Sequence, residues 1–571
     1  MMNLIDLPED VIVCICYWLR VEDVLRLTET CRALHTLASS DYVWHQIPLD
    51  LPLPLRPDTP RSSLSARELR HLAVHALRLN RNWRQPVFAR PRITHIEHGN
   101  IVFRSELLPN DRLCTLSRSL TSMTYFTVWL LADSGYRREH CFETPGALNF
   151  AAGLVRGSDD ALVAIIGRAP GRSEFLDIYR VPASKSADEV DPPQVSLVAS
   201  VCRPSHEGTF SEVHIADYIV AVSLAKFEGQ QVPSYEILLV NTRTCVHLLV
   251  HPKLPQTSDQ KHLRLCGAVE PRHILFLSTS PGRTASLTTH IHALPTELFD
   301  AEEPPDAESI RARTPVPSLR VRRGSPPQSS PSSPPPPTSP APRPVELGPL
   351  VHRHEVPTVP IRLQTYASDV QMNPASGRCS FALLAFHGAY VGSRGQAGAR
   401  AMFFSLPTRR RSTASNGAGI YASNSSAQAA STDIQTFRMD PLVGLDAVCL
   451  GRTGRRAVWL ERNWENDIFA LVKADFGAAA GHAFGALAVG TEWKTASVDC
   501  NPISSDAKAT GDPRQTSQTT AEKRQPVIAP LLPPHLALPF EAHACQSLAF
   551  DEAKGRVCLA MHTGDVYVVD F

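Results

Sequence analysis

Two short stretches of the sequence carry side chains that could bind a metal ion. His290 and His292 alternate within a strand-like segment, so both imidazoles would lie on one face of a strand. No third ligand is identifiable nearby, which favours structural or surface histidines. Cys14 and Cys16 lie two residues apart in a helical pattern, where such side chains point in different directions. We therefore expect neither pair to bind a metal and predict no cofactor.

The motifs of several common enzyme classes are missing. The sequence contains no GxxxxGK[ST] phosphate loop, no GxSxG nucleophile elbow, no HExxH zinc motif and no set of kinase motifs. Gly417 and Gly419 lie in a serine-rich stretch, so they do not form a dinucleotide-binding loop. We predict no catalytic residue.

Three serines are candidates for phosphorylation. Ser325 and Ser412 each follow a run of arginines, at 320–323 and 409–411, in the arrangement that basophilic kinases favour, and Ser330 precedes a proline. The arginine runs are also compatible with nuclear import. A solvated linker without either role is the plainer interpretation, because charged tracts of this kind are common.

The composition limits the class of protein. The 571 residues include 57 Lys+Arg and 56 Asp+Glu, and this near-neutral balance predicts neither a nucleic acid nor a membrane surface as partner. No segment approaches the ~20 apolar residues that span a bilayer. The 13 cysteines are scattered and odd in number, which favours a reducing compartment. We expect a cytoplasmic or nuclear protein, or one found in both places.

The hydrophobic pattern divides the chain near residue 87. Residues 1–50 show three short helical patterns and a further short segment ending at Trp44, and Pro8 suits the first position of the first helix. Within 51–87, a capping box that begins at Ser65 opens a longer amphipathic helix ending near Asn82-Trp83. Such a small helical unit exposes apolar surface, which suggests a partner.

Residues 88–571 have the pattern of an all-β domain. Short apolar segments are separated by turn residues and predict the strands Phe126–Leu131, Ala161–Ile166, Phe175–Val181, Tyr218–Leu224, Tyr235–Val240, Ile274–Leu277 and Val557–Met561. A strand, a tight glycine turn and a second strand recur near residues 377, 454 and 555, which favours a β-propeller. Segments 303–345, 408–432 and 500–527 are polar or proline-rich and are predicted to be disordered inserts. Without them, about 390 residues remain, enough for seven or eight blades.

Residues 7–44 resemble the F-box. The resemblance rests on the Leu-Pro start at Leu7-Pro8, on Asp23-Val24-Leu25, on Cys31-Arg32 and on the closing Val43-Trp44. The remaining layout, with a connecting helix and β repeats, is similar to that of F-box proteins with WD-like propellers. The expected architecture is therefore a multidomain α + all-β protein: a three-helix F-box and connecting helix, then a seven- or eight-bladed propeller with disordered inserts.

This resemblance implies a substrate receptor of an SCF-type cullin-RING ubiquitin ligase. The F-box would bind the Skp-type linker and through it a cullin, and the propeller would bind an unidentified target protein. Carried over by position, the linker-binding residues are Leu7, Pro8, Ile12, Leu19, Leu27, Cys31 and Trp44. One alternative is an F-box and propeller scaffold outside a ligase. A second, a propeller enzyme, would need acids or histidines clustered at strand ends, and the sequence shows no such clustering.

Overall fold

The computed structural model describes most of the chain. The residues outside the description are 1–6, 48, 50, 56–58, 60, 86–90, 133–134, 170, 172, 184–193, 228–233, 253–258, 267–271, 281–285, 300–342, 358–362, 374–377, 388–397, 408–429, 440–442, 464, 478–525 and 533–538. The predicted inserts fall largely outside the described residues. Their last residues do not, because 343–345, 431–432 and 527 belong to strands, so those insert boundaries were wrong.

The described N-terminal region consists of helices. These are α1 (Glu9–Trp18), α2 (Val21–Leu27), α3 (Arg32–Ala38), α4 (Asp41–Gln46) and, after a 3-10 turn at Arg61–Ser63, α5 (Ala66–Arg84). The short segment expected to end at Trp44 is a helix, α4, whose N-terminal amides are capped by the Ser40 hydroxyl. Pro8 is not the first helical residue. It has an extended backbone and lies just before α1, where its carbonyl accepts the first helical hydrogen bonds.

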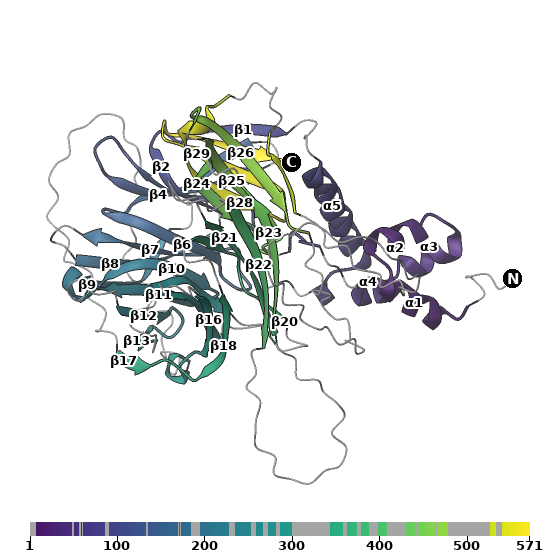
Figure 1. Ribbon diagram of the computed structural model, residues 1–571, viewed down its shortest axis with the longest axis horizontal. Helices are drawn as coiled ribbons and strands as arrows, with labels where there is room; N and C mark the ends of the chain where they lie inside the picture. The colour runs from purple at the N-terminus through teal and green to yellow at the C-terminus, as the bar shows by residue number, and fades with distance from the viewer. Residues whose placement is uncertain are drawn as a thin grey trace, which may run out of the picture.

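The β region is a ring of seven sheets among the described residues (Figure 1), so the prediction of seven or eight blades narrows to seven. Blade 1 contains β2 (Ile101–Leu108), β3 (Arg112–Arg118), β4 (Thr124–Ala132) and β5 (Gly135–Glu143). Blade 2 contains β6 (Ala147–Leu154), β7 (Ala161–Ala169), β8 (Ser173–Val181) and β9 (Ser196–Pro204). Blade 3 contains β10 (Thr209–Ala216), β11 (Ile219–Lys226), β12 (Ser234–Asn241), β13 (Val246–His251) and β17 (Arg343–Glu346).

The ring continues in the same order along the chain. Blade 4 contains β14 (Asp259–Cys266), β15 (His273–Ser280), β16 (Ser286–Ala293) and β18 (Leu350–Pro357). Blade 5 contains β19 (Leu363–Ala367), β20 (Gln371–Asn373), β21 (Arg378–His387), β22 (Gly398–Pro407) and β23 (Ser431–Arg438). Blade 6 contains β24 (Val443–Leu450), β25 (Arg456–Asn463), β26 (Ile468–Asp475) and β27 (Val527–Pro530). Blade 7 contains β28 (Cys545–Asp551), β29 (Arg556–Met561), β30 (Asp565–Asp570) and β1 (Arg92–Glu97).

The ring closes by pairing the two ends of the β region. β1 is antiparallel to β30, with Arg92 opposite Asp570 and Glu97 opposite Asp565, so the first strand completes the last blade. Buried apolar side chains fill the space between neighbouring sheets, as where Ile178 of blade 2 and Val222 of blade 3 share one core cluster. All seven strands predicted from the sequence lie within strands of the propeller.

Candidate functional site

The four short helices and the first half of α5 share one hydrophobic core. Trp44 is fully buried at its centre, and its indole Nε1 donates to the Ala38 carbonyl oxygen at 2.8 Å. Leu69 and Ala73 of α5 belong to the same cluster. The helical unit therefore extends beyond residue 50, because α5 supplies part of the apolar surface that four short helices lack.

Two of the predicted linker-binding residues are core residues. Trp44 is 0% exposed and Ile12 is 5% exposed, so their side chains contact this chain rather than supplying surface. Pro8 is exposed. The others are half-buried and pack on the edge of the core: Leu7, Leu19, Leu27 and Cys31.

The solvent side of α1 carries an apolar stripe that the sequence comparison missed. Val11 and Trp18 are 42% and 74% exposed, and Cys14 between them is also exposed. The spacing of Leu7, Val11, Cys14 and Trp18 puts them on one face of a helix, opposite the buried Ile12. A signal was present: α1 is apolar at nearly every position after Asp10, and a helix that is apolar all round is normally buried on all sides. The α1 stripe is therefore a candidate partner surface.

The second half of α5 docks on blades 6 and 7. Trp83 is 1% exposed and stacks on Phe550 at 5.1 Å between ring centroids, with Phe571 edge-on at 5.8 Å. Its indole Nε1 donates to the Ala474 carbonyl oxygen at 3.0 Å, and the Arg456 guanidinium lies 5.5 Å from its ring. A single helix thus contributes to the cores of both units, which fixes the helical unit against the propeller (Figure 1).

Charged groups surround Trp83 at this junction. Arg84 Nε lies 2.9 Å from Oδ2 of the buried Asp475. Lys473 Nζ, 1% exposed as a residue, donates to the Gln85 carbonyl oxygen at 2.6 Å. Burial lowers the pKa of Lys473 to about 8 despite the nearby Asp475 carboxylate. The junction is therefore held by apolar packing and by polar groups whose partners are lost if α5 leaves.

A glycine turn of the predicted repeat lies under α5. Gly555, between β28 and β29, has a φ of +67°, and a Cβ there would lie 2.2 Å from Leu79 Cδ1. A side chain at this position would both strain the turn and push the helix away. Because this turn joins the first two strands of blade 7, α5 lies on the face of the ring where the first strand of each blade ends.

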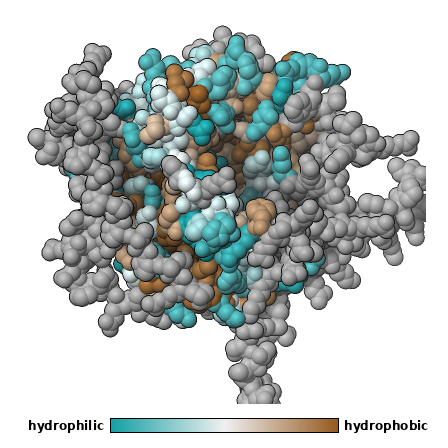
Figure 2. All heavy atoms as spheres, turned by 90° about the vertical axis from the view of Figure 1, so that its left-hand side faces the viewer, coloured by the Kyte–Doolittle hydropathy of each residue, from teal (hydrophilic) through white to brown (hydrophobic). Residues whose placement is uncertain are grey.

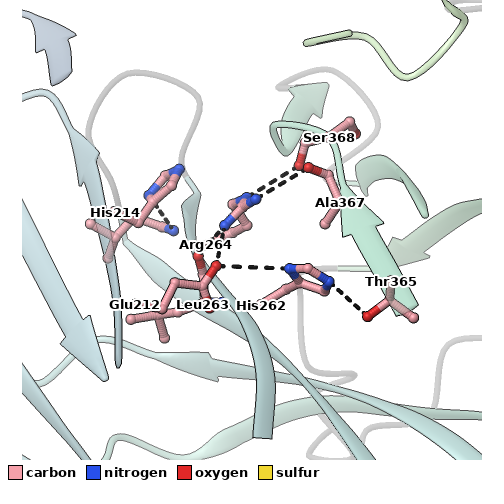
Figure 3. Close-up of polar contacts among 9 residues, drawn as sticks. Glu212, His214, His262, Leu263, Arg264, Thr365, Ala367 and Ser368 are labelled. Atoms are coloured by element: carbon pink, nitrogen blue, oxygen red, sulfur yellow. Dashed lines mark hydrogen bonds and ion pairs between the residues drawn. The ribbon is translucent and has the colours of Figure 1, made fainter. Parts of the chain in front are cut away.

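The inner strands of blades 3, 4 and 5 are joined by a polar cluster (Figure 3). Arg264 donates to Glu212 at 2.9 Å and to the Ala367 carbonyl oxygen at 3.1 Å, and His262 contacts both Glu212 and Thr365. Burial alone would raise the pKa of Glu212, but the His262 hydrogen bond and the Arg264 charge lower it to about 2. Since these groups satisfy one another, the cluster ties three blades together and leaves no obvious place for a ligand.

The histidine pair considered as a metal site is part of blade 4. His290 and His292 lie on one face of β16, where both rings stack on Phe276. His290 Nε2 is 2.9 Å from Ser278 Oγ, and His292 Nδ1 is 3.0 Å from the Gly348 carbonyl oxygen. Among the described residues, no three His, Cys, Asp or Glu side chains are grouped as a metal site would require. Of Cys14 and Cys16, the first is exposed and the second is buried.

The candidate phosphorylation sites Ser325, Ser330 and Ser412 lie outside the described residues. No helix in the described part of the chain is long and apolar enough to cross a membrane. Both faces of the propeller therefore remain as candidate surfaces for a protein partner, one of them beside α5.

The fold and the α1 stripe define a helical adaptor-type domain fixed to a seven-bladed propeller. Residues 4–49 match the F-box-like family model, so the chain carries an F-box-like domain followed by a β-propeller. No curated protein sequence matches it. Among solved structures, the crystal structure of the Myceliophteria thermophila Cps50 (Swd1) β-propeller domain is similar at 8% identity and a TM-score of 0.36, over 84% of this chain and 100% of that one.

Proposed function

We propose that this protein is a substrate receptor of an SCF-type ubiquitin ligase. Its F-box-like domain would bind the Skp-type linker and through it a cullin, and its propeller would bind a target protein. The protein would contribute proximity, because tethering raises the effective concentration of target lysines near the ubiquitin donor. No residue of this chain would take part in the transfer, and we place its action in the cytoplasm, the nucleus or both.

The observation that carries the proposal is the uncovered α1 stripe within a domain that matches the F-box-like model. A 74% exposed tryptophan beside an exposed valine is costly to leave in water and has the composition of an interface anchor. The Tyr17 ring packs edge-on against Trp18 at 5.7 Å, which limits the movement of the indole. A partner that covers this stripe would bury apolar area at little entropic cost.

The face away from the helices supports a separate surface for the target. Strands β3 and β11 are the second strands of their blades, so they end on the side opposite α5. Leu120 and Phe227 follow these strands and are 97% and 68% exposed. Figure 2 shows this side of the molecule, where hydrophilic and hydrophobic side chains are interspersed. Loops on such a face are free to bind a partner because the strands beneath them form the packed blades.

The test is capture of linker and cullin by the protein carrying Val11→Ala and Trp18→Ala. Both side chains are exposed, so folding should be unaffected, and two lost anchors of ~2 kcal/mol each should weaken linker binding by several hundredfold. Leu120→Ala is the matched control, an exposed apolar residue on the propeller, and should capture cullin like the wild type. Equal cullin recovery from the double variant, or none from the wild type, would refute the ligase role and leave the scaffold alternative.

A further inference from the structure

The solvent side of α5 carries a row of basic residues that neither core uses. We propose that this basic face, made of Arg67, His71, His75, Arg78 and Arg81, is a docking surface for an acidic polypeptide segment. All five residues are exposed. At 100° per residue they lie within about a third of the helix circumference, opposite the side that packs on the two cores.

The arginines of the basic face have no anionic partner. Within the described part of the chain, Arg67, Arg78 and Arg81 make no hydrogen bond or ion pair, and each keeps its guanidinium in solvent. Glu68, the one acidic residue of α5, is engaged with Ser65 in the N-terminal capping box. The positive charge along the helix is therefore not neutralised by the helix itself.

The charges reinforce one another and extend onto the propeller. The pKa of His75 is lowered first by burial and then by the neighbouring His71, Arg78 and Lys554. Lys554 belongs to the β28–β29 turn and pairs with Asp111 at 2.6 Å. A positive surface that lowers the proton affinity of its own histidine gains free energy when an anion binds.

The geometry favours a short acidic segment over other anions. Arg67 and Arg81 are separated by about 21 Å along the helix, a distance that an extended chain of about seven residues would span. Arginine pairs well with carboxylates because its planar fork matches their two oxygens. Three arginines give few contacts to a nucleic-acid backbone, and the whole chain has a net charge of only +1. A membrane-surface helix would need a free apolar face, whereas that of α5 is buried.

The position of the basic face gives this docking a role in the proposed function, on which that part of the inference rests. α5 lies between the F-box-like core and blades 6 and 7, so a bound acidic segment would sit between linker and target. Any component of the ligase assembly or the target could supply it. The binding itself depends on the α5 charges alone.

The experiment measures fluorescence anisotropy of a labelled oligoglutamate of about eight residues on the full-length protein. Changing Arg67, Arg78 and Arg81 together to Gln should weaken binding about tenfold, the combined effect of three exposed charge contacts. The same three positions changed to Lys keep the charge and should retain most of the affinity. The matched control removes three propeller arginines instead, at Arg92, Arg118 and Arg353, and should bind like the wild type.

Each outcome decides the proposal. Equal binding by the wild type and the Gln variant, or an equal loss in the propeller control, would overturn it. A single-stranded DNA of equal charge that binds more tightly than the peptide would assign the face to nucleic acid instead. Linker and cullin capture by the Gln variant should be unchanged, because the α1 stripe is intact. Failure of cullin capture with normal peptide binding would therefore reject the ligase role and leave the docking surface standing.

Discussion

Replacing Trp83 with alanine tests whether the junction on blades 6 and 7 fixes the helical unit. The indole is 1% exposed, stacks on Phe550 and donates to the Ala474 carbonyl oxygen at 3.0 Å. Removing a buried tryptophan costs ~3–5 kcal/mol, and the hydrogen bond to Ala474 is part of this loss. Lys473 would also lose its apolar neighbour while its ammonium stays buried. We expect the C-terminal half of α5 to open from the propeller.

Hydrogen exchange followed by mass spectrometry measures this opening directly. A loss of ~3–5 kcal/mol in docking lowers the protection of residues 74–84 by ~10²–10³-fold or more, until exchange reaches the rate of the detached helix. The F-box-like core should keep its protection, since Leu69 and Ala73 pack there independently. Cullin capture should therefore persist while target modification falls, because the two binding surfaces are no longer held in one geometry.

Two further variants keep this reasoning open to refutation. Trp83→Phe retains a ring against Phe550 but lacks the indole N–H, so its protection should be intermediate. Trp129→Ala removes another buried tryptophan, 6% exposed, from the core between blades 7 and 1, far from α5. If Trp129→Ala opened α5 as much as Trp83→Ala, or if Trp83→Ala left exchange of residues 74–84 unchanged, the junction would not depend on the contacts described here.

Two other predictions concern the propeller. Deleting residues 306–340, which precede β17, should change stability by less than ~1 kcal/mol because loop-closure entropy varies only with the logarithm of loop length; a thermal midpoint lowered by ten degrees or more would contradict this. Burial lowers the pKa of His214 and of His290 to about 4. Both groups bind protons more readily when unfolded, so stability is full above about pH 6.5 and falls towards pH 4. Each should contribute ~2 kcal/mol of destabilisation at pH 5, and equal urea midpoints at neutral pH and at pH 5 would refute it.

The local pattern was sufficient for most elements. Ser65 and Glu68 predicted the start of α5 because a capping box depends only on residues three apart. The strands around Phe126 and Val557 were predictable because their apolar runs end at turn residues. The insert boundaries failed for the same reason: Arg343-Pro344-Val345 has no strand pattern of its own, and it becomes β17 only by pairing with β13.

The sequence by itself determined the F-box-like helices, the all-β character of the rest and the repeated glycine turns, since each depends on neighbours within a few residues. Only the tertiary structure decided which apolar residues face outward. Ile12 and Trp44 match the family pattern equally well whether they are core or surface, and packing against α5 buries both. Val11 and Trp18 remain exposed because no other element of the described chain covers that side of α1. Ring closure through β1 and β30 was equally invisible, because it pairs residues more than 450 positions apart, which sequence periodicity cannot relate.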